Sequence, residues 1–174
     1  MAHHILIERR KFMRWLPLII ILVLIAGGGL LAANNIKEPD KRRWTLVSLA
    51  YMAGLGVILF TPISFNGLSV YVMPAGVGRV NYTRLYLHGA GFIENIILTM
   101  PLGFMIKKIF HQIPISIVGL LGLVIGGGIE LAQYYMSQYW LINRSSDIND
   151  IIANALGILV GGILVVIYKT IKEN

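Results

Sequence analysis

Long apolar segments separated by short polar ones dominate the chain. The first, Trp15 to Ile36, carries no charge over 22 residues. As a helix rising about 1.5 Å per residue, it is long enough to cross a bilayer core of about 30 Å. Later apolar segments predict four more spans: Trp44 to about Phe60, near Tyr86 to Lys107, near Ile113 to about Met136, and Asp150 to Tyr168. The pattern predicts an all-α fold, a polytopic membrane helical bundle of about five transmembrane helices.

The segment between the second and third spans does not follow a helical pattern. Residues 64–78 are uncharged and contain Asn66-Gly67, Pro74 and Gly76, which are turn signals. We expect an interfacial loop there, with a short strand-like or re-entrant piece. Pro101 falls inside the third span, where it predicts a kink.

Glycines recur at a four-residue spacing in the last two spans. Gly122 and Gly126 form one such pair, and Gly157 and Gly161 form the other. In lipid, small residues at this spacing let two helix backbones approach closely. The two pairs in consecutive spans predict a tight hairpin of the fourth and fifth spans.

Composition supports a membrane protein. Hydrophobic residues make up 56% of the chain and charged residues only 13%, whereas an ordinary globular domain has about 25% charged residues. The mean hydropathy is +0.73. The net charge of +7 comes from short Lys and Arg clusters beside the apolar segments, which suits a membrane surface better than nucleic acid. Cysteine is absent, so disulfides and thiolate chemistry are excluded.

The distribution of these cations suggests an orientation in the cell membrane. Five spans put the loops before the third span and after the fourth on one side, with Arg79, Arg84, Arg144 and the basic amino terminus. The other side holds a larger set, which we assign to the cytoplasm: Lys37, Lys41, Arg42, Arg43, Lys107, Lys108, Lys169 and Lys172. The basic amino terminus conflicts with this assignment.

Polar residues gather on the side of the membrane that holds the loop before the third span and the loop after the fourth span. Glu130 and Gln133 lie on one face near the end of the fourth span, and Arg144 follows in the turn. A carboxylate in the membrane is costly unless it is paired, and Arg144 is the expected partner of Glu130. The pair either closes the hairpin or presents charge to a ligand.

A stripe of polar residues opens the fifth span. Asp147, Asp150 and Asn154 are spaced i, i+3 and i+7. Ser146 or Asp147 is expected to cap the helix, while Asp150 serves either capping or function. Asn154 lies two turns in and needs a partner across the helix interface, either Gln133 or Asn95.

No reaction motif accompanies these residues. Carboxylates with a histidine such as His88 could bind a divalent cation or act as acid and base, but no metalloprotease, hydrolase or phosphate-loop pattern is present. The adjacent His3 and His4 are not expected to form a metal site. We therefore expect no metal and no cofactor, and a binding role rather than catalysis.

Four segments resemble the VanZ-like family of small membrane proteins. They are Asn95 to Phe104, similar to the family's N-x-x-x-x-x-P-x-G-F helix, Ile129 to Gln133, Arg144 to Asp150, and Asn154 to Gly157. The resemblance covers residues 41–168 and implies one shared polar site of Glu130, Gln133, Arg144, Asp147, Asp150 and Asn154, which Asn95 faces from the third span. The founding member of the family is associated with low-level teicoplanin resistance.

The resemblance implies three parts of the chain: an extra amino-terminal helix and loop at 1–40, a VanZ-like membrane domain at 41–168, and a polar tail at 169–174. The implied partner is a membrane lipid or another cell-envelope component, bound at a polar site near the outer leaflet in a bacterial type of cell. An enzyme acting on a lipid head group and a purely structural membrane protein are the alternatives.

Overall fold

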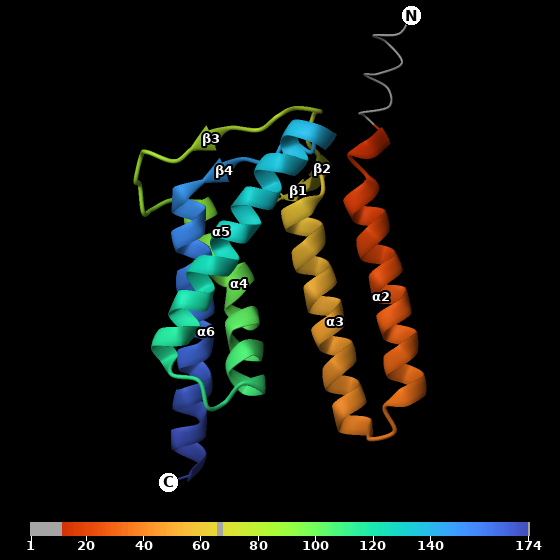
Figure 1. Cartoon of the computed structure of the whole chain (residues 1–174), viewed down its shortest axis with the longest axis vertical. Helices are drawn as coiled ribbons and strands as arrows, with labels where there is room; N and C mark the ends of the chain where they lie inside the picture. The colour runs from red at the N-terminus through yellow and green to blue at the C-terminus, as the bar shows by residue number, and fades with distance from the viewer. Residues whose placement is uncertain (1–11, 66–67, 174) are drawn as a thin grey trace, which may run out of the picture. The chain divides into compact units, whose positions relative to one another are not determined.

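The structure is a computed structural model that describes residues 12–65 and 68–173. His3, His4 and the Asn66-Gly67 turn lie outside the described residues. Within the described part, five helices are long and apolar enough to cross a membrane, which confirms the predicted all-α class. They are α2 (Leu16–Asn35), α3 (Pro39–Phe60), α4 (Ala90–Ile109), α5 (Ile115–Trp140) and α6 (Ile148–Glu173) (Figure 1).

The chain divides into two compact units. Unit 1 comprises the residues up to 79 together with 133–145, and unit 2 comprises 80–132 together with 146–174. Helix α5 contributes its last residues to unit 1 and the rest to unit 2.

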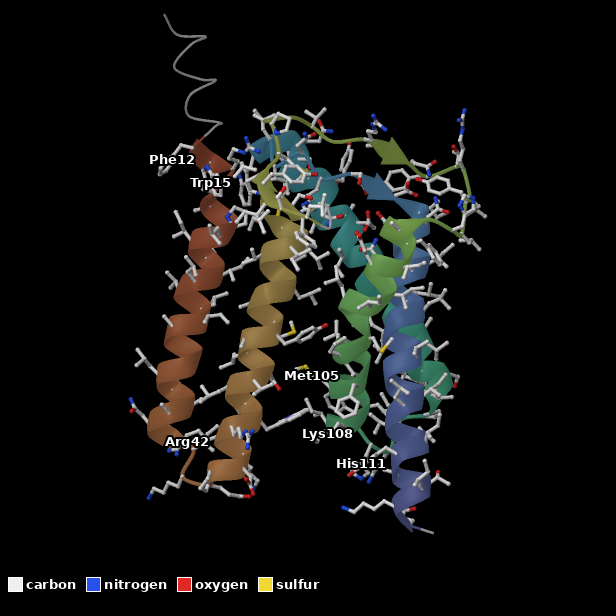
Figure 2. All side chains as sticks on the ribbon, turned by 180° about the vertical axis from the view of Figure 1, so that it is seen from behind. Phe12, Trp15, Arg42, Met105, Lys108 and His111 are labelled. Atoms are coloured by element: carbon white, nitrogen blue, oxygen red, sulfur yellow. The ribbon has the colours of Figure 1, made fainter. Side chains whose placement is uncertain are left out.

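Unit 1 is built on the antiparallel helices α2 and α3, which lie side by side (Figure 1). Pro39 at the first position of α3 fixes its start, because its missing N–H is not needed there. Beyond the other end of α3, strands β1 (Ile63–Phe65) and β2 (Val70–Val72) form an antiparallel hairpin, which confirms the predicted strand-like piece. Figure 2 shows Phe12 and Trp15 at the hairpin end of unit 1 and Arg42 at the opposite end.

Unit 2 packs α4 against α6 along much of their length. Glycine makes this approach possible: a Cβ at Gly103 would collide with the backbone of Ile158, and a Cβ at Gly161 would collide with the carbonyl of Met100. At Gly157 the obstacles are Thr99 and the carbonyl of Ile96. The two helices therefore meet backbone to backbone.

Helix α5 approaches α6 through the other glycine pair. A Cβ at Gly122 would lie 3.0 Å from the backbone of Ala155, and one at Gly126 would lie 2.8 Å from the carbonyl of Ile151. The expected close approach of the fourth and fifth spans is thus confirmed for Gly122 and Gly126. It was wrong for Gly157 and Gly161, which meet α4, because α6 uses different faces for its two neighbours.

Several helix boundaries differ from the expected ones. Helix α3 begins at Pro39 rather than at Trp44, and α6 continues to Glu173 rather than ending at Tyr168. Helix α4 begins at Ala90 rather than near Tyr86, because Gly89 precedes it with a positive φ of 103° that a helix cannot contain. Tyr86 and His88 therefore lie in the segment before the helix. Helix α5 continues to Trp140, beyond the expected end at Met136, and Leu141 and Asn143 then take positive φ values in the turn. Pro101 lies inside α4 as expected.

The strand end of unit 2 holds a second small sheet. Strand β3 (Val80–Asn81) pairs in parallel with β4 (Ser146–Asp147), with Asn81 opposite Asp147. The end away from these strands holds Lys108 and His111 (Figure 2). There the buried Lys107 donates hydrogen bonds to the carbonyls of His111 (2.8 Å) and Ile113 (2.6 Å), which closes the turn between α4 and α5.

Candidate functional site

The seven candidate residues fall into two groups, one in each unit. Unit 2 holds Asn95, Glu130, Asp147, Asp150 and Asn154, and unit 1 holds Gln133 and Arg144. The single shared site that the resemblance implies, and the ion pair between Glu130 and Arg144, stay predictions. Each group has its own partners within its unit.

Asp147 is the centre of the unit 2 group. It immediately precedes α6, and its Oδ1 accepts the backbone N–H of Asn149 at 2.9 Å, so it caps the helix as expected. The same oxygen accepts the side-chain amides of Asn81 (2.9 Å) and Asn149 (2.6 Å), and Oδ2 accepts the hydroxyl of Tyr86. With so many donors, Asp147 is occupied by structural hydrogen bonds.

These hydrogen bonds also decide how Asp147 titrates. Burial alone would raise the pKa of Asp147, but the donors from Tyr86, Asn149 and Asn81 outweigh burial and hold the pKa below its ordinary value. In turn, the hydrogen bond to Asp147 raises the pKa of the Tyr86 hydroxyl. Asp147 is therefore a stable carboxylate at neutral pH, and Tyr86 remains a donor to it.

Glu130 supports the same helix start from α5. Its side chain is buried at 2% exposure, and its Oε2 accepts the backbone N–H of Asp147 at 2.8 Å. The hydroxyl of Ser146 donates to the backbone carbonyl of Glu130 at 2.9 Å. This arrangement resembles a capping box whose glutamate comes from a neighbouring helix. Glu130 thus has a structural role at the α5–α6 junction.

Asp150 and Asn154 continue along α6 toward the interior of unit 2. The Asp150 carboxylate is half-buried, lies within hydrogen-bonding reach of Asn95 on α4, and its charge also acts on Glu130. Asn154 is fully buried, and neither atom of its amide has a hydrogen-bond partner among the described residues. The expected partnership of Asn154 with Asn95 was therefore wrong, and the one with Gln133, which belongs to unit 1, stays a prediction. Its backbone carbonyl, in contrast, accepts the hydroxyl of Thr99 at 3.1 Å.

In unit 1, Gln133 and Arg144 bind the backbone where α3 ends. A helix leaves its last carbonyls without partners, and the Gln133 amide donates to one of them, that of Leu59, at 3.0 Å. Arg144 donates from Nε to the carbonyl of Thr61 at 3.1 Å and from Nη2 to that of Ile63. Ser137 fixes the Arg144 backbone through hydrogen bonds of 2.9 Å to both its N–H and its carbonyl.

Arg144 has no carboxylate partner among the described residues of its own unit. The acidic residues there are Glu38 and Asp40, at the start of α3, and Glu38 pairs with Lys41 at 2.8 Å. Helix α3 has 22 residues, which puts about 33 Å between its two ends. The guanidinium of Arg144 is thus held by neutral carbonyls, and burial lowers its pKa from the ordinary value.

Sequence reasoning missed several residues of the unit 2 group. Asn81, Tyr82 and Tyr86 lie far from α6 in sequence and reach it only through the pairing of β3 with β4. The polar run before α4 was the available signal, but nothing local specifies its pairing partner. Asn149, buried at 1% exposure, accepts the N–H of Tyr86 at 2.7 Å. Among the described residues, no group of three His, Cys, Asp or Glu side chains could hold a metal ion.

The fold and the two polar groups define a small polytopic helical membrane protein with polar residues concentrated where its spans end. The chain matches the VanZ/LLP1 family model over residues 15–169 and belongs to that family. No curated protein and no solved structure matches it. The matched residues include α2, the helix we expected to lie outside the family's pattern; the boundaries at residues 40 and 168 stay predictions.

Proposed function

We propose that this VanZ-family protein binds an anionic component of the cell envelope near the outer leaflet, and that binding contributes to resistance to glycopeptides of the teicoplanin type. The observation that carries the proposal is the positive charge of Arg144. Its guanidinium is oriented by two carbonyls and has no carboxylate to neutralise it among the described residues of unit 1. An arginine held in this way retains its charge and its remaining donors for an anionic ligand.

The outward orientation rests on the cations of each unit. In unit 2, Arg84 is the basic residue at the strand end, whereas Lys107, Lys108, Lys169 and Lys172 lie toward the other end. In unit 1 the loop between α2 and α3 and the start of α3 carry Lys37, Lys41, Arg42 and Arg43. Because cytoplasmic ends collect Lys and Arg, unit 2 favours an outer position for its strand end. Unit 1 favours it by only four described cations to three, because its strand end carries Arg14, Arg79 and Arg144.

The test compares glycopeptide susceptibility of cells that express wild type, Arg144→Ala or Arg144→Lys at equal membrane levels of folded protein. We expect Arg144→Ala to bring susceptibility to that of cells without the protein, and Arg144→Lys to retain part of the resistance through its charge. Arg43→Gln is the matched control, because it removes an exposed cation at the far end of unit 1 and leaves Arg144 and its partners in place; it should keep full resistance. Full resistance with Arg144→Ala, or no resistance from the wild type, would contradict the proposal.

A second candidate, an enzyme acting on a lipid head group, is favoured by the carboxyl groups of Glu130 and Asp150 within unit 2, where the charge of Asp150 acts on Glu130. Two neighbouring carboxylates can serve as general acid and base. Purified protein incubated with phospholipids of different head groups should then release product, and Asp150→Asn should abolish release. The absence of turnover with every head group would count against this candidate.

In the purely structural alternative, the polar residues only hold the helices together. Glu130→Gln would then lower the thermal stability in detergent, and any change in susceptibility would follow the amount of folded protein. A loss of resistance in Arg144→Ala at an unchanged protein level would contradict the structural alternative.

A further inference from the structure

The base of the β1–β2 hairpin contains a proline opposite a residue that needs a donor. Ile63 pairs with Val72, so the register puts Pro62 opposite Met73, and the N–H of Met73 donates to the carbonyl of Pro62 at 2.8 Å. In a hydrogen-bonded antiparallel pair, the two opposite residues exchange both bonds. Pro62 has no N–H to return, so the carbonyl of Met73 requires another donor.

Arg14, which lies just before α2, supplies that donor. Its Nη2 donates to the carbonyl of Met73, although the two residues are 59 positions apart. The side chain is buried at 8% exposure, and its Nε has no hydrogen-bond partner among the described residues. A buried donor without a partner costs about 1–3 kcal/mol. The N–H at Nε is therefore free to donate a hydrogen bond to an oxygen of a ligand.

Arg144 occupies the adjacent edge of the same strand. The carbonyls of Thr61 and Ile63, which it binds, point to the side of β1 opposite that of Pro62, because successive peptide groups of a strand alternate in direction. The two arginines therefore bind carbonyls at the start of the hairpin, Arg14 on the side of β1 that faces β2 and Arg144 on the other side. Both are held by neutral carbonyls, and the described acidic residues of unit 1 lie at the far end of α3.

We propose that Arg14 and Arg144 together form an anion site at the base of the β1–β2 hairpin that takes the phosphate group of a membrane-anchored phosphate or diphosphate ester. This inference rests on the proposed function, since it names the class of ligand that Arg144 meets and adds Arg14 as a second arm. Two guanidinium groups match the charge of about −1.5 to −2 on a phosphate monoester, and their forked donors match its oxygens. The hairpin follows directly on the end of α3, whose 22 residues are long enough to cross a bilayer core, so we expect it near the lipid phosphates.

The test measures the thermal unfolding midpoint of the full chain in detergent by tryptophan fluorescence, at increasing concentrations of short-chain phosphatidic acid. Diacylglycerol of the same chain length is the uncharged comparison, and inorganic diphosphate is the lipid-free one. We expect phosphatidic acid to raise the midpoint in a saturable way and diacylglycerol to leave it unchanged. Stabilisation by diphosphate alone at equal concentration would show that a free phosphate suffices and would overturn the membrane-anchored part of the proposal.

Variants then assign the effect to the two arginines. Arg14→Gln should raise the apparent dissociation constant for phosphatidic acid by about 10-fold or more, which is the loss of affinity expected for a charge-assisted hydrogen bond. Arg14→Lys should have a smaller effect, because it keeps the charge. Arg43→Gln, which removes an exposed cation at the far end of unit 1, should have none. If Arg43→Gln weakens binding as much as Arg14→Gln, binding reflects net charge and the two-arginine site is wrong.

The outcomes separate this inference from the proposed function. If Arg144→Ala abolishes resistance but phosphatidic acid stabilises wild type and Arg14→Gln equally, the two-arginine site fails and the proposed function stands. If Arg14 and Arg144 are both needed for phosphate binding but resistance is unaffected, the site stands and the proposed function fails. Wild type that is not stabilised by phosphatidic acid overturns the inference whether or not the variants fold.

Discussion

Replacing Gly103 by alanine tests the close packing of α4 on α6. The added Cβ would collide with the backbone of Ile158, and a backbone cannot rotate away as a side chain can. Overpacking of this kind costs about 1–3 kcal/mol, and the high end is expected here because the helices themselves must separate. Alanine offsets about 1 kcal/mol through its better helix propensity. The expected net loss is about 2 kcal/mol of the free energy of unfolding.

Gly127→Ala provides the matched control. Gly127 is also inside a membrane helix, but nothing lies within 4 Å of the position of its added Cβ. The same substitution there should gain up to about 1 kcal/mol, so the two variants should differ by about 3 kcal/mol. The assay is unfolding of the purified chain in mixed micelles at increasing sodium dodecyl sulfate, followed by circular dichroism. If Gly103→Ala is as stable as Gly127→Ala, the backbone contact does not hold α4 against α6.

Three further changes test the polar groups by the same unfolding assay or by its pH dependence. Asn154→Leu should stabilise the protein by about 1–2 kcal/mol, because it removes a buried amide without partners and keeps a similar shape; a destabilised variant would show that the amide has a partner. Lys107→Met should cost about 2 kcal/mol through two lost charge-assisted hydrogen bonds, and an unchanged midpoint would contradict this. The ionised form of Asp147 should stabilise the fold above the ordinary carboxyl pKa of about 3.9, and this contribution should be lost as the pH falls through the lower pKa of the folded state. The protonated Tyr86 hydroxyl, whose pKa is raised, should stabilise below about pH 10 and lose its effect as the pH rises through the folded-state pKa; Tyr86→Phe should abolish this alkaline dependence, and a variant that keeps it would place the titration elsewhere.

The spans could be predicted because lipid imposes a simple requirement on length and polarity. Each apolar segment had to be about 20 residues long and helical to satisfy its own backbone, and the five helices confirm this. The residues at which the helices begin and end depend on local capping and backbone conformation, which the sequence predicts only in part. Asp147 was recognisable as a cap, whereas Gly89, whose positive φ starts α4 later than expected, carried no comparable signal.

Helix partners and strand pairs were harder to predict, because they depend on contacts between distant residues. The glycine spacing indicated that Gly157 and Gly161 meet a neighbouring backbone, but not that the neighbour is α4. Likewise, the polar residues before α4 were visible, but the pairing of Asn81 with Asp147 follows from a sheet of only two residues per strand. A pairing so short has almost no sequence pattern of its own.

The partners of the polar residues also resolve which of them remain available for a ligand. Asp147 and Glu130, the most conspicuous acidic residues in the sequence, hold the start of α6, and their carboxyl oxygens accept backbone and side-chain donors. Arg14 and Arg144 hold carbonyls, which orient a guanidinium without cancelling its charge. An acceptor that receives several donors is satisfied, while a cation that donates only to neutral groups still attracts an anion. We therefore expect the strand end of unit 1 to attract an anion, for a reason that residue type alone does not reveal.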